Sequence, residues 1–532
     1  MEAATLTERY YAQGYWRHDT LWDTLSRVAL ARPEAIAFID GDRSISYGAL
    51  LAEAGRFAGA LRAQGIHPGE AVIIHGRNAL ETVIALLGCW RQGYVAIPVP
   101  PMFSAAQLVA IIGNAQARVM INCTGSDALE QAASAASACA LPCLVTMALR
   151  DGAIGWNDFL ASGNAAPAAA PAGADALAML IYSSGTTGAP KGVMHSSNTI
   201  RYTAEQIARL HEIGPQDTVM VACQFGFIGS AAFGLLLTLV SGATGVLVGR
   251  WSAELGLELI ERHRVSYSLF MPTHVIDLLA APALRSTDCS SFRRGILAGI
   301  TAQQREMAAQ LLCAQPYAMF GMSECAGQTT GAPGDAPDKR AQTDGHTLPG
   351  ADTIIVDDQD RPLPAGSCGN VLVRGPSRCL GYYGAPELTG AAISKDGYFR
   401  TGDLGVVDAE GYFTFASRAR DVLRRGGVTI VPAEIEDSLR KNPQVREAAI
   451  IGLPDARLGE RACACVIAAS GHQPTLESLN AGLERDGVAQ YLWPEVLILF
   501  EDMPRTASLK VKKAELRTMV LAQMAAGDNA AA

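Results

Sequence analysis

The sequence of 532 residues lacks the cysteine patterns that would assign a metal centre. It contains twelve cysteines but no Cys-x-x-Cys pair, and no histidine and cysteine stand at a spacing typical of zinc sites. Cys463 and Cys465 lie two residues apart in an alternating apolar run, where small buried side chains are expected. We therefore expect free thiols and a reducing compartment, the cytoplasm.

Basic side chains are also scarce. The chain has 43 lysines and arginines against 52 acidic residues, a net charge of −9, and no long basic run. Sequence-independent binding of nucleic acid needs a basic surface, so we expect no nucleic-acid partner. The first ten residues carry charges and have no apolar stretch of the kind found in a signal peptide.

Charge is absent altogether from residues 219–249, which are long enough to span a bilayer. Glycines at 226, 229, 234, 242 and 245 and five polar residues interrupt this segment. We predict that they divide it into strand, turn, helix, turn and strand. A buried core unit is therefore favoured over a transmembrane helix, and no transmembrane segment is expected.

What the chain does have is a dense glycine and hydroxyl cluster at residues 182–192, after the apolar run 176–181. Glycine backbone, hydroxyls and Lys191 together favour an anion. The Walker pattern requires glycine at 190 and a hydroxyl at 192, where this chain has Pro190 and Gly192. We interpret the cluster as another kind of phosphate loop; a Ser/Gly-rich surface turn is the alternative.

The order of predicted elements indicates an α/β protein with doubly wound, mostly parallel sheets. Strand-like runs at 71–75, 94–99 and 118–122 alternate with helical patterns at 47–64 and 79–91. From residue 351, short strands between Asp, Pro and Gly turns predict a small β subdomain. We place a domain boundary near residue 421, between a large N-terminal domain (1–420) and a small α+β C-terminal domain (421–532).

Four further clusters follow the loop in order. They are Phe320-Gly321-Met322-Ser323-Glu324 at a glycine turn, Gly397–Gly405 with Asp403 in a glycine-flanked turn, Ser417–Asp421 before a basic loop, and Pro504–Lys510. Each alone reads as a surface turn. In this order, and with Pro432–Glu436, they resemble the adenylate-forming superfamily of acyl- and aryl-CoA synthetases, peptide-synthetase adenylation domains and luciferases, over nearly the whole chain.

The resemblance implies a cytoplasmic ATP-dependent ligase that works in two steps. A carboxylate first attacks the α-phosphorus of ATP and releases pyrophosphate, and a thiol then displaces AMP. ATP, Mg²⁺ and coenzyme A are the implied cofactors. A small carboxylic acid and coenzyme A are the implied partners of a monomer or homodimer. A carrier-protein thiol is the alternative acceptor, and a nucleotide-binding regulator without turnover is the less favoured reading.

The resemblance also implies roles for individual residues. Thr186, Thr187 and Lys191 would hold the β- and γ-phosphates, Ser323 the α-phosphate, and Glu324 the magnesium ion. Phe320 would lie near the adenine, and Asp403, supported by Arg418, would bind the ribose. The implied nucleotide-binding set is Ser183, Ser184, Gly185, Thr186, Thr187, Gly188, Lys191, Gly299, Ile300, Phe320, Gly321, Ser323, Asp403 and Arg418.

By the same resemblance, the C-terminal domain rotates between the two steps. Lys510 would stabilise the charged transition state of the first step. Asp421 would be the hinge, and Gly426 and Gly427 would line the tunnel for the thiol.

The acid pocket is where the chain departs most from its relatives. Many acyl-CoA synthetases have Phe-His-x-x-Gly where this chain reads Phe225-Gly226-Phe227-Ile228-Gly229. With glycine in place of histidine, we expect an apolar and widened pocket lined by Phe225, Gly226, Phe227, Ile228, Gly299 and Met322. This favours an alicyclic or aromatic acid, as in cyclohexanecarboxylate-type ligases, or a medium-chain fatty acid.

Overall fold

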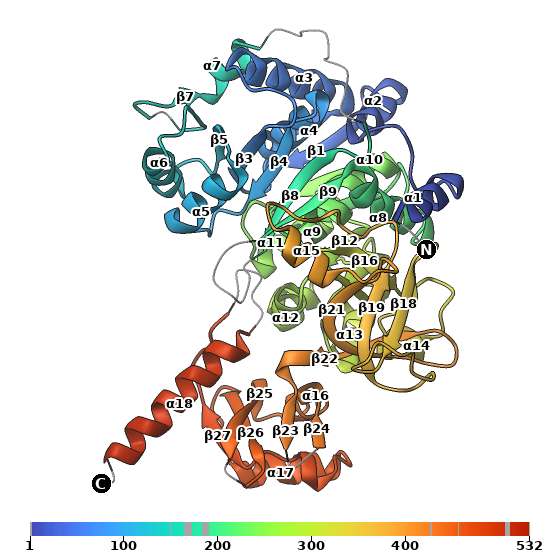
Figure 1. The fold of residues 1–532 in the computed structure, drawn as a ribbon, viewed down its shortest axis with the longest axis vertical. Coiled ribbons are helices and arrows are strands. Elements are labelled where there is room, and N and C mark those ends of the chain that lie inside the picture. The colour runs from blue at the N-terminus through green and yellow to red at the C-terminus, as the bar shows by residue number, and fades with distance from the viewer. Residues whose placement is uncertain are drawn as a thin grey trace. The chain divides into compact units, whose positions relative to one another are not determined.

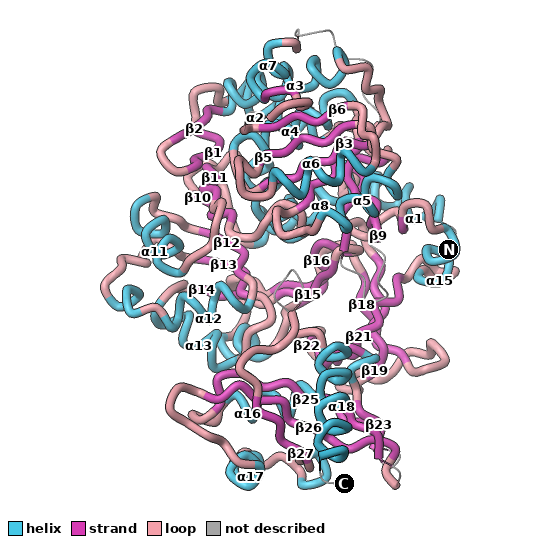
Figure 2. The backbone as a smooth tube through the Cα atoms, turned by 90° about the vertical axis from the view of Figure 1, so that its left-hand side faces the viewer, coloured by secondary structure: helices cyan, strands magenta, loops and turns pink. Residues whose placement is uncertain are grey.

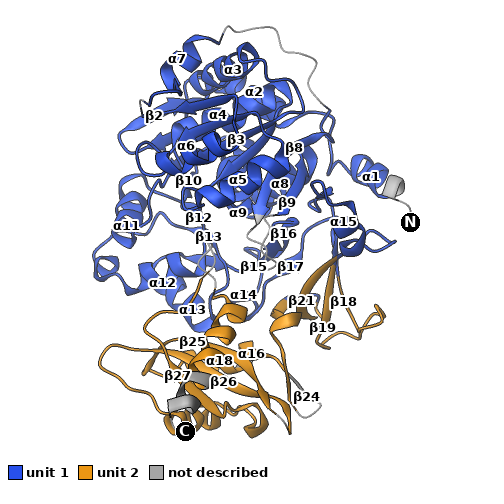
Figure 3. Cartoon of the chain, turned by 60° about the vertical axis from the view of Figure 1, so that its left-hand side comes forward, with its two compact units in different colours: residues 1–353, 373–399, 411–413 blue, residues 354–372, 400–410, 414–532 orange. Residues whose placement is uncertain are grey.

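The chain is described by a computed structural model (Figure 1). It describes residues 3–148, 150–163, 173–183, 191–425, 428–455, 457–505 and 511–530. The described chain divides into two compact units (Figure 3). The larger comprises 1–353, 373–399 and 411–413, and the smaller comprises 354–372, 400–410 and 414–532. Our boundary near residue 421 stays a prediction.

An eight-stranded sheet forms the first layer of the larger unit. Its strands pair in the order β20-β9-β8-β4-β3-β5-β6-β7. Pairing is parallel from β8 through β4 to β7, while the pairs β8–β9 and β9–β20 are antiparallel. Its members are β3 (Ala71–Gly76), β4 (Val95–Val99), β5 (Val119–Cys123), β6 (Cys143–Thr146), β7 (Ile154–Gly155), β8 (Leu177–Ser183), β9 (Lys191–Ser196) and β20 (Gly381–Tyr382).

The second layer of the larger unit is a seven-stranded sheet, in the order β14-β13-β12-β10-β11-β1-β2. All its pairs are parallel except the β1–β2 hairpin. Strands β3, β4, β5 and β12 are buried at every position, as expected for strands covered on both faces. The members are β1 (Ile36–Asp40), β2 (Arg43–Ser46), β10 (Thr218–Val221), β11 (Thr244–Leu247), β12 (Tyr267–Phe270), β13 (Arg294–Leu297) and β14 (Gln315–Tyr317).

Helices cover these sheets, as Figure 2 shows in cyan. In Figure 1, α3 and α4 lie on one side of β3 and β5, and α5 and α6 on the other, the arrangement of a doubly wound sheet. The helices of the larger unit are α1 (Ala3–Ala12), α2 (Leu21–Ala31), α3 (Tyr47–Ala63), α4 (Leu80–Gln92), α5 (Ala105–Ala115), α6 (Leu129–Ala138), α7 (Trp156–Ala161), α8 (Ser197–Leu210), α11 (Ala253–Arg262), α12 (Pro272–Ala280), α13 (Ala302–Leu311), α14 (Pro337–Gln342) and α15 (Pro386–Ala392). The predicted fold class is confirmed.

The uncharged segment folds as predicted, between two strands of the seven-stranded sheet. It runs from β10 through α9 (Ile228–Ser230), a π-helical turn (Ala231–Leu236) and α10 (Leu237–Ser241) to β11. Phe233 and Leu235 to Leu237 are fully buried in the core that both sheets share. Among the described residues, no helix is long and apolar enough to cross a membrane.

Two smaller sheets follow along the chain. The three-stranded one holds β15 (Met319–Met322), β16 (Cys325–Thr330) and β17 (His346–Thr347). The four-stranded one, in the order β18-β19-β21-β22, holds β18 (Asp352–Val356), β19 (Gly369–Arg374), β21 (Phe399–Val407) and β22 (Phe413–Arg418). The latter corresponds to the short strands predicted from residue 351.

The rest of the smaller unit is built around a long hairpin of β25 (Val445–Asp455) and β26 (Gly459–Ala468). Cys463 and Cys465 lie in β26 and are fully buried free thiols, as expected. The other elements are β23 (Leu423–Arg425), β24 (Val428–Ile430), β27 (Val496–Leu499), α16 (Pro432–Arg440), α17 (Leu476–Arg485) and α18 (Lys513–Ala530).

Candidate functional site

Part of the predicted site lies outside the described residues. This holds for Ser184, Gly185, Thr186, Thr187 and Gly188 of the phosphate loop, for Gly426 and Gly427, and for Lys510. What the structure does place are the two strands that flank the loop. β8 ends at Ser183 and β9 begins at Lys191, and the two pair antiparallel from Leu177↔Ser196 to Ser183↔Lys191. The predicted loop therefore connects neighbouring strands of one sheet.

Ser323 and Glu324 form the tight turn between β15 and β16. We expected a turn at Gly321, but that residue lies within β15. A side chain there would lie 3.2 Å from the backbone oxygens of Cys325 and Ala326, so glycine permits the close approach of β16. The hydroxyl and the carboxylate are consequently at the tip of the hairpin.

Tyr382 of β20 and His195 of β9 hold this turn. The Tyr382 hydroxyl donates to Glu324 Oε1 at 2.7 Å, and the Cys379 amide donates to the Glu324 carbonyl at 2.7 Å. His195 Nε2 lies 2.8 Å from the Ser323 carbonyl. A carbonyl can only accept, so Nε2 carries the proton.

The protonation states agree with these bonds. Burial lowers the pKa of His195 to about 4, against the opposing effect of the Ser323 carbonyl. The imidazole is therefore neutral at pH 7. Burial, and then the Glu324 carboxylate, raise the pKa of Tyr382 well above its usual value, so its hydroxyl keeps the proton that it donates.

Lys191 lies on the same strand as His195. Its Nζ is 5.8 Å from the centroid of the Tyr382 ring, within reach of a cation–π interaction. Tyr382 thus contacts both the predicted phosphate-binding lysine and the predicted metal-binding carboxylate. Neither Tyr382 nor His195 was among the predicted residues. The pattern Gly381-Tyr382-Tyr383-Gly384 was the available signal for Tyr382, and His195 had none.

A magnesium ion fits this donor set. Among the described residues, no group of three or more His, Cys, Asp or Glu side chains could hold a metal alone. Mg²⁺ is commonly bound through one or two carboxylates together with substrate phosphates and waters. Glu324 offers one such carboxylate, so the site suits a magnesium ion that enters with a nucleotide.

Asp403 lies in the middle of β21, whereas we expected it in a turn. The preceding Gly402 has φ +70°, a conformation that favours glycine, and this irregularity lies inside the strand. The Asp403 carboxylate is 2 % exposed and forms an ion pair with Arg418 of β22, in which Nε lies 3.0 Å from Oδ1. The Asp403 amide donates to Thr401 Oγ1, which itself donates to the Val371 carbonyl. The pair suits two vicinal hydroxyls, and this role stays a prediction.

Other predicted residues are placed singly. Phe320 is buried, with its ring 4.7 Å from that of Phe413. Gly299 and Ile300 form the turn between β13 and α13, and the Ile300 carbonyl accepts from Arg305 at 3.2 Å. Met322 is half-buried at the end of β15, and Asp421 ends a short 3₁₀ turn after β22.

Phe225 and Gly226 form the turn that leads into α9, with Phe227 and Ile228 following it. Phe225 and Ile228 are buried, and the Phe225 amide donates to Asn78 Oδ1. The expected widening at Gly226 is wrong. A Cβ at this position would lie 2.2 Å from Pro100 Cδ, so the proline ring already fills the place of the missing side chain. The segment is apolar, as predicted, but it is closed by Pro100.

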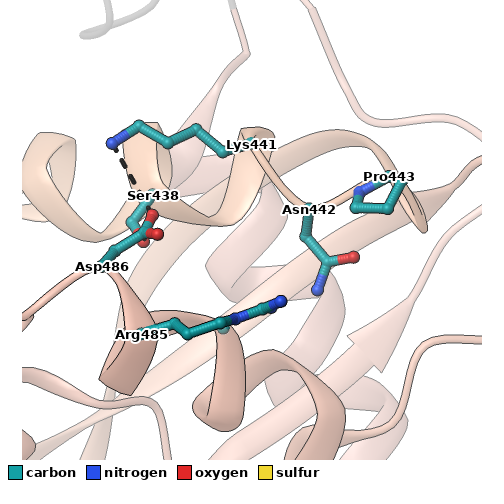
Figure 4. Close-up of a pocket in the computed structure, with 7 residues that line it drawn as sticks. Ser438, Lys441, Asn442, Pro443, Arg485 and Asp486 are labelled. Carbon is teal, nitrogen blue, oxygen red and sulfur yellow. Dashed lines mark hydrogen bonds and ion pairs between the residues drawn. The ribbon is translucent and has the colours of Figure 1, made fainter.

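A polar pocket lies on the smaller unit, between the C-terminal ends of α16 and α17 (Figure 4). There Asp486 accepts a hydrogen bond from Ser438 at 2.7 Å and forms an ion pair with Lys441 at 3.6 Å. None of the predicted site residues lines it. The lining residues are Ser438, Lys441, Asn442, Pro443, Gly482, Arg485 and Asp486.

Comparison with known proteins identifies two matching family models. The model of the AMP-binding enzyme matches residues 25–383, and that of the AMP-binding enzyme C-terminal domain matches residues 434–510. Similar proteins include a medium-chain fatty-acid–CoA ligase of Escherichia coli K12. It is 29% identical over 97% of this chain and 93% of its own length.

Two further relatives are similar in sequence or structure. The salicyl-AMP ligase / salicyl-S-ArCP synthetase of Mycobacterium tuberculosis is 31% identical, over 95% of this chain and 91% of its own. The crystal structure of the anthranilate CoA ligase AuaEII in complex with anthranoyl-AMP is 25% identical. It matches with a TM-score of 0.87 over 94% of this chain and 97% of that one.

Proposed function

The chain belongs to the family of AMP-binding enzymes, and from this premise we propose that its substrate is an apolar carboxylic acid, either alicyclic, aromatic or medium-chain. It is an AMP-forming acid–thiol ligase that uses ATP, Mg²⁺ and coenzyme A. The observation that carries the proposal is the uncharged turn of Phe225 to Ile228, closed by the Pro100 ring. The named acids of the three relatives have medium-chain or aromatic skeletons, which supports it.

In the first step, an oxygen of the acid attacks the α-phosphorus and the bond to pyrophosphate breaks. Such a reaction depends on positioning and on charge neutralisation. Lys191 and the loop would hold the outer phosphates, Ser323 the α-phosphate, and Asp403 with Arg418 the ribose. Glu324 would hold Mg²⁺, which would supply positive charge. Lys510 would stabilise the negative charge of the transition state.

In the second step, the thiol attacks the acyl carbon, the acyl–oxygen bond breaks, and AMP leaves with the oxygen of the acid. Phe225, Phe227 and Ile228 would exclude water from the acyl group and so limit hydrolysis of the intermediate. The hinge at Asp421 and the glycines at 426 and 427 would bring the thiol in. These roles rest on the resemblance.

The test is a competition among acids. The purified protein is incubated with ATP, Mg²⁺, coenzyme A and an equimolar mixture of cyclohexanecarboxylate, benzoate, octanoate, acetate and malonate. Acyl-CoA products are then quantified by mass spectrometry. We expect kcat/KM for one of the first three acids to exceed that for acetate and malonate by about 100-fold or more, since each buried methylene contributes about 0.8 kcal/mol. Preference for acetate or malonate would refute an apolar substrate.

A carrier protein is the second candidate acceptor, which the named activity of the Mycobacterium relative favours. The same incubation without coenzyme A separates the two. Without coenzyme A, a coenzyme A ligase releases pyrophosphate slowly, and adding coenzyme A accelerates the release. A carrier-loading enzyme stays slow until a phosphopantetheinylated carrier protein is added. If no acid causes release of pyrophosphate, a nucleotide-binding regulator without turnover is favoured.

A further inference from the structure

Strand β20 has an edge position in the eight-stranded sheet and contacts two segments that are far from it in the chain. It pairs antiparallel with β9, with Tyr382 opposite Val193. Backbone bonds from Leu380 to Met194 and from Tyr383 to Gly192 extend this pairing to the strand that begins at Lys191. The Cys379 amide holds the Glu324 carbonyl. Backbone hydrogen bonds therefore hold the strand in place independently of its side chains.

Of the two adjacent tyrosines, Tyr382 is the last residue of β20 and Tyr383 lies in the turn that follows. Tyr382 is the one that faces the turn of Ser323 and Glu324, where its hydroxyl donates to Glu324 Oε1 at 2.7 Å. Its ring faces the Lys191 ammonium, 5.8 Å from the centroid.

Each contact restricts the rotation of a side chain. A glutamate loses up to about 2 kcal/mol of side-chain entropy when it is fixed, and a partner that fixes it beforehand removes this cost from ligand binding. The hydroxyl occupies Oε1 and leaves Oε2 for a cation. The ring restrains the Lys191 ammonium on its own side. One residue thus fixes an anion and a cation that must act on the same ligand.

We propose that Tyr382 is a positioning residue for the magnesium–ATP complex, in which the hydroxyl orients Glu324 and the ring orients Lys191. The inference rests on the proposed function, because that function makes Glu324 and Lys191 ligand-binding groups. It assigns separate tasks to two parts of one side chain. Loss of the hydroxyl weakens the response to magnesium, whereas loss of the ring weakens ATP binding itself.

The test compares the full-length wild type with Tyr382→Phe and the matched control Tyr383→Phe. Calorimetry measures the ATP dissociation constant at Mg²⁺ concentrations from 0.05 to 50 mM, a range of about a thousandfold that brackets ordinary Mg²⁺ affinities. For Tyr382→Phe we expect the half-maximal Mg²⁺ concentration to rise about 10-fold, the effect of one hydrogen bond to a charged group. At saturating Mg²⁺ its ATP affinity should stay within about threefold of wild type, because the ring remains. Tyr383→Phe should match wild type throughout.

Two further variants test the division of tasks. Tyr382→Leu removes the ring as well, and we expect a further loss of about threefold to tenfold in ATP affinity that saturating Mg²⁺ does not restore. In a Glu324→Gln background, Tyr382→Phe should have no additional effect on the response to Mg²⁺, because the two groups act as one unit. An equal effect in both backgrounds would indicate that the hydroxyl acts independently of Glu324 and would overturn the proposal.

Equal Mg²⁺ responses of Tyr382→Phe and Tyr383→Phe would also overturn it. Failure of the proposed function gives a different pattern. The wild type would then bind ATP with a Mg²⁺ response that Tyr382→Phe shifts, yet no carboxylic acid would release pyrophosphate. Thermal melting of each variant, expected within about 4 °C of wild type, confirms that the binding data refer to folded protein.

Discussion

The two compact units hold their predicted nucleotide-binding side chains in different ways. In the larger unit, the turn at Ser323 and Glu324 is fixed by His195 and Tyr382, which are 128 and 58 residues away in sequence. In the smaller unit, Asp403 is fixed by Thr401 beside it and by Arg418 on the neighbouring strand β22. The larger unit thus depends on long-range packing, and the smaller on local pairing.

This difference predicts how each part responds to substitution. A locally supported side chain can be removed with little effect elsewhere, because its neighbours share one hairpin. A side chain that joins distant segments affects several of them at once.

The largest effect is expected for Lys510→Ala, in the smaller unit. Adenylation should fall about 1,000-fold, because the lysine would act only on the first transition state. Thioester formation from supplied acyl-AMP should stay within about threefold of wild type. Lys512→Ala is the matched control, since Lys512 is 44% exposed and pairs with Glu515 three residues on. Equal loss in both steps would contradict separate roles for the units.

Acid should act more strongly on the larger unit than on the smaller one. The larger unit holds the buried histidines His75, His195, His211 and His274, and burial lowers the pKa of each to about 4. Their ordinary pKa is about 6.5, so the unfolded chain binds more protons as the pH falls from 6.5 towards 4. This contribution to stability is therefore complete above pH 6.5 and is lost below it.

We expect about 1 kcal/mol to be lost per histidine between pH 7 and 5.5. Hydrogen exchange, corrected for the intrinsic effect of pH, should show falling protection in peptides from β3 and β9. Peptides from β25 and β26 should change less, because the one histidine of the smaller unit, His472, is exposed. Equal loss of protection in the two units would contradict a stronger effect of acid on the larger unit.

Asp403→Asn should raise the KM for ATP about 10- to 100-fold with a smaller change in kcat, as expected for loss of a charged hydrogen-bond acceptor. The matched control is Asp360→Asn, whose carboxylate also pairs with an arginine, Arg400, but is 44% exposed. An exposed pair contributes about 0–1 kcal/mol. The thermal midpoint of Asp403→Asn should change little if its support is local. A large loss of stability would show that Asp403 is needed beyond its own hairpin.

The smallest effect concerns the fit between Gly226 and Pro100. Gly226→Ala should destabilise the larger unit by about 1–3 kcal/mol, because the added carbon meets the proline ring. Adding Pro100→Ala should restore part of this loss. In Gly113→Ala of α5 the new carbon meets no atom within 4 Å, and we expect a slight gain. Urea unfolding measures these three variants and Pro100→Ala alone, and additive losses in the double variant would exclude direct contact.

The same contrast explains what the sequence alone could predict. Alternating apolar runs and helical periods are local, and they predicted the sheets, the covering helices and the buried segment 219–249. The motifs predicted Glu324 and Asp403, but not that the turn lies at Ser323 and Glu324 or that Asp403 lies within a strand. Pro100 contacts Gly226 and Tyr382 contacts Glu324 although each pair is far apart in the chain. A single sequence does not show which distant residues meet.

Transfer of ¹⁸O from the acid to AMP tests whether the acid attacks the α-phosphorus of ATP. The preferred apolar acid is labelled with ¹⁸O in its carboxylate and incubated with the protein, ATP, Mg²⁺ and coenzyme A. Mass spectrometry then follows the label. We predict one ¹⁸O atom in each AMP formed, with none in pyrophosphate. Unlabelled AMP, or label in pyrophosphate or inorganic phosphate, would contradict the account.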